Sequence, residues 1–213
     1  MQVPLLDQVD VAGFHSEATR LLAQRVPPNT VQWSAAPSRQ LDTLHDAERA
    51  QIRSRAARAI VPQSFVRMSE LVVLHRDSLR FDLLYRSLWR LVYEPELKHD
   101  FNDCDLARMR QMAQAVRRDM QKMKGRMQFH PLVLKGEPVE VCWYEPAHLI
   151  CEIVGSWLAR EEPRRHWLLL TPDRSLRWDS VRLLAAPALP LDRQLVHVSL
   201  QGWPAMLEDL PWG

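Results

Sequence analysis

The run MQFHPLVLKGEPVEVCWYEPAHLICEIVGSWLAREEPRRHWLLLTPDRSLRWD, residues 127–179, decides the fold class of this 213-residue chain. Its first part contains two apolar segments, residues 127–134 and 139–144, that are rich in strand-forming side chains. Between them, Lys135-Gly136-Glu137-Pro138 has the composition of a four-residue hairpin loop. The run therefore opens with a predicted β-hairpin.

The rest of the run predicts a helix followed by a second hairpin. Residues 147–160 have apolar side chains at helical spacing, and residues 166–171 and 175–179 flank a Pro-Asp-Arg turn. The order is strand–strand–helix–strand–strand, and residues 195–200 are a candidate fifth strand. We predict an α+β fold in which a helical N-terminal half packs on a four- to five-stranded antiparallel sheet.

Helices are predicted for the part of the chain that precedes this sheet. Residues 105–124 form the longest candidate, because apolar side chains recur there at alternating spacings of three and four. Gly125 is expected to end that helix. Two shorter helices are predicted for residues 64–75 and 78–92, the second with Phe81, Leu84, Leu88 and Leu91 on its buried face.

The N-terminal region predicts a mixture of short elements. Asp10 is placed to cap a helix that Pro27-Pro28 stops, and residues 31–33 are a candidate strand. Residues 47–60 predict a polar-faced helix or a linker. We divide the chain into an N-terminal helical segment with its connection (1–61), an α+β core (62–190) and a Trp/Pro-rich C-terminal extension (191–213).

Composition excludes several classes of protein. Apolar residues make up 46% and charged residues 25% of the chain, which is typical of a globular protein and not of a disordered one. No stretch approaches 18 uncharged apolar residues, and the N-terminus lacks the basic segment of a secretion signal. Cys104, Cys142 and Cys151 form no C-x-x-C pair, so we expect reduced thiols, no metal site and a cytoplasmic location.

The net charge of +2 conceals an uneven distribution of charge. Residues 105–128 contain seven basic and two acidic side chains, net +5, whereas the other 189 residues are net −3. Within this segment, three cations recur every seven residues and three every four residues, along a helix of about 30 Å. Together with a neighbouring basic face on residues 78–92, the candidate nucleic-acid-binding residues are Arg86, Arg90, Arg110, Arg117, Arg118, Lys122, Lys124 and Arg126.

An ordinary solvated helix face is the alternative explanation of this basic segment, because 24 of the 28 basic residues of the chain are Arg. Charge alone therefore does not separate a nucleic-acid interface from an Arg-rich surface.

Three stretches of the sequence resemble one known family. They are residues 62–91, with His75-Arg76-Asp77; residues 116–129; and residues 143–179, with Glu145-Pro146-Ala147-His148 and the run TPDRSLRWD. They are similar to an uncharacterised bacterial domain that precedes UdgX-like uracil-DNA glycosylases or stands beside a radical-SAM protein presumed to act on DNA. The resemblance covers residues 10–185 and implies an association with DNA metabolism.

The chain departs from that family at three places. Gln121 stands where the family usually has His, Gly125-Arg126 replaces a pair of one small and one aromatic residue, and Gln128 stands where Arg is common. The glycosylase half of the related fusions is absent from this sequence. The resemblance therefore implies a role near DNA without that enzyme's own activity.

Glu145 and His148 are the candidate catalytic residues. A Glu and a His three residues apart at the start of a helix have the chemistry for acid–base catalysis. The same Glu is equally suited to cap the first turn of the helix, which is the interpretation we favour. The sequence has no phosphate-binding glycine motif, and we expect no cofactor.

We therefore predict a non-catalytic accessory module for DNA repair or defence that binds single- or double-stranded DNA through the basic helix. The alternative is a protein-interaction module that docks a DNA-processing enzyme, such as a glycosylase or a radical-SAM protein, without binding nucleic acid. Its candidate contact is the apolar C-terminal tail, namely Trp203, Met206, Leu207, Leu210 and Trp212.

Overall fold

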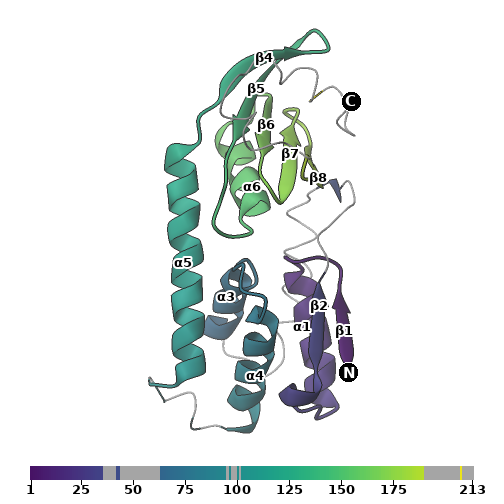
Figure 1. Cartoon of the computed structure of the whole chain (residues 1–213), viewed down its shortest axis with the longest axis vertical. Helices are drawn as coiled ribbons and strands as arrows, with labels where there is room; N and C mark the ends of the chain where they lie inside the picture. The colour runs from purple at the N-terminus through teal and green to yellow at the C-terminus, as the bar shows by residue number, and fades with distance from the viewer. Residues whose placement is uncertain are drawn as a thin grey trace. The chain divides into compact units, whose positions relative to one another are not determined.

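The computed structural model describes residues 1–35, 42–43, 63–94, 96, 100, 102–189 and 207. These residues form two compact units (Figure 1). Unit 1 takes in the described residues from Met1 to Asp119 apart from 42–43, and unit 2 takes in residues 42–43 and those from Met120 on. The domain boundaries expected near residues 61 and 190 lie outside the described residues and stay predictions, as does the packing of the helical half on the sheet.

Unit 1 consists of helices and a two-stranded parallel sheet. Its elements are β1 (Gln2–Leu5), α1 (Val11–Ala23), the short 3-10 helix η1 (Pro28–Thr30), β2 (Gln32–Ala35), α3 (Gln63–Val72), α4 (Arg80–Tyr93) and the first part of α5 (Cys104–Arg126). The predicted cap of α1 is confirmed, because Gly13 N donates to Asp10 Oδ1 over 2.7 Å. The helix predicted for residues 47–60 lies outside the described residues.

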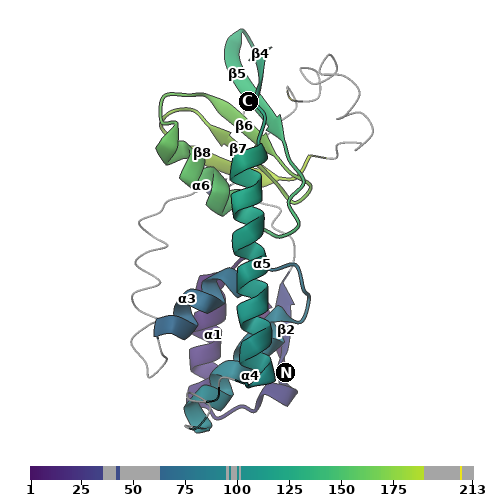
Figure 2. The ribbon, with the colours of Figure 1, turned by 90° about the vertical axis from the view of Figure 1, so that its left-hand side faces the viewer.

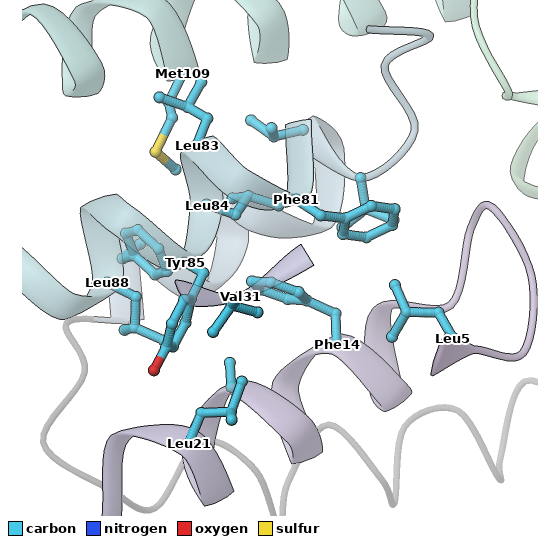
Figure 3. Close-up of a cluster of buried hydrophobic side chains, with 14 of the residues drawn as sticks. Leu5, Phe14, Leu21, Val31, Phe81, Leu83, Leu84, Tyr85, Leu88 and Met109 are labelled. Carbon is cyan, nitrogen blue, oxygen red and sulfur yellow. The ribbon is translucent and has the colours of Figure 1, made fainter. Parts of the chain in front are cut away.

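The core of unit 1 lies between α1, α4 and the start of α5, as Figure 3 shows. The rings of Phe14 and Phe81 lie 5.6 Å apart between α1 and α4. Tyr85 is buried beside them, and its hydroxyl donates to Val26 O over 2.7 Å. The predicted buried face of residues 78–92 is confirmed, and Met109 of α5 is fully buried in the same cluster.

Unit 2 is a sheet with one helix, α6 (Cys151–Glu161), inserted between its strands. The strand order is β3-β8-β7-β6-β5-β4. The strands are β3 (Asp42–Thr43), β4 (His130–Leu134), β5 (Glu137–Trp143), β6 (Trp167–Leu170), β7 (Arg174–Trp178) and β8 (Leu183–Pro187). The predicted α+β class and the order strand–strand–helix–strand–strand are confirmed.

Three details of the predicted sheet are wrong, and the two-residue strand β3 at its edge was not predicted. β5 and β6 pair in parallel, because α6 returns the chain to the edge of the sheet from which β5 began. β8 was missed, since its sequence LLAAP lacks the β-branched and aromatic residues that mark a strand. The first hairpin turns through two residues, Lys135 and Gly136, whose φ angles of 51° and 82° fit a type I′ turn. The candidate strand at residues 195–200 lies outside the described residues.

The central strands of the unit 2 sheet are covered on both faces. On the face of α6, a Cβ on Gly155 would overlap the side chain of Leu176, so the helix lies very close to β7 (Figure 2). On the opposite face, Val141, Leu168, Leu170 and Ala186 form a buried cluster with Leu207. β6 is therefore buried along its whole length, which explains its uninterrupted apolar sequence WLLL.

The helix α5 is longer than predicted. It continues past Gly125 to Arg126, and Gly125 lacks the left-handed backbone conformation that ends many helices. Among the described residues, no helix is both long enough and apolar enough to span a membrane.

Candidate nucleic-acid interface

The exposed face of α5 carries no acidic side chain. The exposed residues of this helix are Cys104, Arg108, Arg110, Gln111, Gln114, Arg117, Arg118, Gln121, Lys122, Gly125 and Arg126. The two carboxylates of the helix are elsewhere: Asp119 is buried, and the side chain of Asp105 is only 19% exposed. The charge that α5 presents to solvent is therefore entirely positive.

The predicted apolar seam explains why these side chains face solvent. Of this seam, Met109, Ala113, Val116 and Met123 recur at spacings of four, three and seven, and all four are buried. A helix that buries this stripe turns its polar residues outward. The sequence therefore fixes which residues of α5 are exposed.

The start of α5 is held by a network of ion pairs. The N–H of Leu106 donates to Asp103 Oδ1 over 2.9 Å, so Asp103 caps the helix. The other oxygen of Asp103 accepts from Arg90 over 2.7 Å. Arg86 forms two hydrogen bonds to Asp105, of 2.8 and 2.7 Å, and Arg90 also binds Glu94.

Arg86 and Arg90 are consequently not isolated cations. The hydrogen bond to Asp105 raises the pKa of Arg86, and the bond to Asp103 raises that of Arg90. The same contact with Arg86 lowers the pKa of Asp105. The sequence pattern groups both arginines with the basic helix. It does not show that Arg90 pairs with Asp103, 13 residues later, or that Arg86 pairs with Asp105, 19 residues later.

Four of the predicted cations remain available on α5. Arg117, Arg118, Lys122 and Arg126 are exposed, and they form no ion pair or hydrogen bond within the described parts of the chain. Lys124 is half-buried, with its Nζ 4.1 Å from the centre of the Trp157 ring. Arg110 is exposed and has an interaction of its own.

The cations of α5 form two rows with amides between them. At about 100° per residue, Arg110, Arg117 and Lys124 follow one line along the helix, here called the first row. Arg118, Lys122 and Arg126 form the second row, which turns about 40° around the helix at each step of four residues. Gln114 and Gln121 are exposed and lie in the angle between the rows. Gln114 is the part of this surface that sequence reasoning missed, and Gln121 stood out only as a departure from the family, although the helical spacing alone would have placed both.

The sequence also does not show that Arg108 differs from the other exposed cations of α5. It is exposed on α5 but pairs with Asp77 over 2.7 Å, in the loop before α4. Like Arg86 and Arg90, it takes part in the ion pairs that bind the start of α5 to the rest of unit 1.

Glu145 and His148 lie in the loop between β5 and α6. Glu145 is exposed and His148 is half-buried, and each has an interaction within the chain. The predicted capping by Glu145 is wrong, because α6 begins at Cys151 and its cap position is Ile150. The apolar residues Leu149 and Ile150, which suggested an earlier start of the helix, are buried in a loop together with Pro146.

The residues next to this loop form a buried structural contact. Arg174 Nε donates to Glu152 Oε1 over 2.9 Å, and both side chains are buried. Burial raises the pKa of the Cys151 thiol beside them, so this cysteine stays protonated. Among the described residues, no three His, Cys, Asp or Glu side chains are grouped closely enough to hold a metal ion.

The tail proposed as a protein contact is described at one residue only. Leu207 is buried against the sheet, in the cluster with Leu168 and Leu170, and is not available to a partner. Trp203, Met206, Leu210 and Trp212 lie outside the described residues.

The chain belongs to the family of a domain of unknown function, DUF4130, whose family model matches residues 78–191. The match covers more than half of the chain and includes α4, the whole of α5 and the strands from β4 to β8. No curated protein and no solved structure matches the chain.

Proposed function

We propose that this protein is a non-catalytic accessory module of DNA metabolism that binds nucleic acid through the exposed face of α5. A single observation supports the proposal most strongly, namely that every charge exposed on this helix is positive. Phosphates attract such a surface, and arginine adds two-pronged hydrogen bonding that matches a phosphate group.

The acids within α5 explain how this face stays positive. Asp105 and Asp119 would cancel two of the six positive charges of the exposed face if they stood on it. Asp105 is instead bound to Arg86 and Arg90, and Asp119 is buried. The proposal therefore depends on Arg117, Arg118, Lys122 and Arg126, with Arg86 and Arg90 in a structural role.

The proposal includes a partner and a location. The resemblance to domains joined to uracil-DNA glycosylases, or adjacent to a radical-SAM protein, suggests that the module places such an enzyme on DNA. A cytoplasmic location agrees with three unpaired cysteines, of which Cys142 and Cys151 are buried.

Gel mobility shift of the purified chain with single- and double-stranded DNA, at 50 and 200 mM salt, tests the proposal. We expect a shift at low salt that weakens at high salt, because bound phosphates release counterions. The double variant Arg117→Glu/Arg118→Glu is expected to weaken binding about 30-fold or more, since each lost phosphate contact costs about fivefold near physiological salt.

A matched control changes the same total charge elsewhere. Arg67 of α3 and Arg164, which follows α6, are exposed and form no ion pair with the described residues. The variant Arg67→Glu/Arg164→Glu is expected to bind within about threefold of the unaltered protein. Absence of any shift at 50 mM salt, or equal losses in the two double variants, would overturn the proposal.

A further inference from the structure

From the arrangement of side chains on α5 we infer the kind of nucleic acid: it is double-stranded DNA, with α5 lying along the major groove. This inference rests on the proposed function and adds the class of ligand. Three features of α5 support it: the two cationic rows, the amides between them and the absence of aromatic side chains.

The two rows fit the two backbones of a duplex. Arg117 of the first row and Arg118 of the second are consecutive residues, so they stand at the same level of the helix and point about 100° apart. The major groove of B-form DNA is about 12 Å wide and admits an α-helix. In that position Arg117, the available cation of the first row, faces the phosphates of one strand, and the second row faces those of the other. A single strand has one backbone and would engage one row.

The amides lie where base edges would be. Gln114 and Gln121 are exposed between the rows, seven residues apart, which is about 10.5 Å along the helix. A glutamine amide donates and accepts, as the adenine edge in the major groove requires. This strip contains no carboxylate that would repel the phosphates on either side.

Single-strand binding needs a feature that α5 lacks. Proteins that bind single strands stack bases on exposed aromatic rings, and α5 contains no Phe, Tyr or Trp. The nearby Trp157 ring is occupied by Lys124 at 4.1 Å. The exposed Tyr93 of α4 packs against Trp89 with its ring tilted by 44°, and its hydroxyl donates to Leu22 O, so it is engaged within unit 1.

Fluorescence anisotropy with three probes tests the inference: a 20-base-pair DNA duplex, each of its strands alone, and an RNA duplex of the same sequence. The DNA duplex is expected to bind at least tenfold more tightly than the other two. The major groove of an RNA duplex is too narrow and deep for side chains to read, so RNA is the probe for groove entry. Four phosphate contacts predict an approximately 150-fold loss of affinity between 50 and 200 mM salt.

Single variants test whether both rows act. Arg117→Gln and Arg118→Gln are each expected to weaken duplex binding about fivefold, and the two together about 25-fold, whereas Arg164→Gln leaves it unchanged. Far-ultraviolet circular dichroism verifies that each variant is folded.

The outcomes separate the two proposals. Equal or tighter binding of a single strand or of the RNA duplex would overturn the inference and leave nucleic-acid binding standing. An effect confined to one row would do the same, since it indicates contact with one backbone. Failure of all three probes at 50 mM salt would overturn the proposed function, and this inference with it.

Discussion

At the residue scale, two partly buried polar contacts of unit 1 connect different helices. Asp103 both caps α5 and binds Arg90 of α4. His15 of α1 lies 2.9 Å from Ser69 Oγ of α3. Because the Ser69 hydroxyl donates to Val66 O over 2.8 Å, its oxygen accepts from His15, which places the proton of the neutral ring on Nε2.

His15 is expected to make the stability of the protein depend on pH. Burial lowers its pKa below the ordinary value of 6.5, so the unfolded chain binds the proton more readily. The stabilisation is then complete above about pH 7 and is lost as the pH falls toward the folded-state pKa. Urea unfolding at pH 7.5, 6.5 and 5.5 measures this decrease in the free energy of unfolding.

The variant His15→Gln is the control, because its amide keeps a donor for Ser69 and does not titrate. We expect its free energy of unfolding to change less than that of the unaltered protein between pH 7.5 and 5.5. Parallel curves for the two proteins would show that another group causes the dependence.

At the scale of secondary-structure elements, α5 and α6 use their glycines in opposite ways. Gly155 of α6 faces Leu176 of β7, with no space for a Cβ between the helix and the sheet. Gly125 of α5 has no atom within 4 Å of an added Cβ, and its backbone is helical. The first glycine permits close packing, whereas the second only weakens its helix.

Alanine substitutions at these glycines are therefore expected to have opposite effects. Gly155→Ala should lower the free energy of unfolding by about 1–3 kcal/mol through overpacking against Leu176. Gly125→Ala should raise it by about 0.5–1 kcal/mol, the difference in helix propensity. Urea unfolding monitored by circular dichroism compares the two, and a loss of stability on Gly125→Ala would show that this end of α5 has a structural need for glycine.

At the scale of the whole molecule, positive charge is concentrated in one segment, and the core of the sheet includes a residue from near the end of the sequence. The segment 105–128 is net +5 in a protein that is otherwise net −3. Residue 207, near the end of the sequence, completes the apolar face of the sheet formed by residues 130–187. The C-terminal extension is thus part of the core of unit 2 at this residue.

Leu207→Ala is expected to lower the free energy of unfolding by about 2–4 kcal/mol, since the side chain is 95% buried among Val141, Leu168 and Leu170. The control Val133→Ala alters a side chain that is 64% exposed on β4 and should cost less than about 1 kcal/mol. Chemical denaturation measures both. Equal effects would place Leu207 outside the stabilising core.

The sequence by itself determined the class of the fold and the exposed face of α5. Hydrophobic periodicity is local, so it located α4, α5 and four strands of the sheet, and the buried Met seam of α5 placed its cations on the outside. Only the tertiary structure decided which cations are neutralised. Asp103 and Asp105 reach Arg90 and Arg86 through contacts 13 to 19 residues apart, and spacing along one helix does not encode such pairs.

The tertiary structure also decided the pairing of the sheet. The parallel contact of β5 with β6 follows from the path of α6, and the weak sequence LLAAP becomes β8 because β7 offers it backbone partners. Both depend on hydrogen bonds between strands rather than on the preferences of single residues. The structure thus contains the basic helix that the sequence predicts. Which of the predicted cations remain available is decided by ion pairs between different elements, and these the sequence does not show.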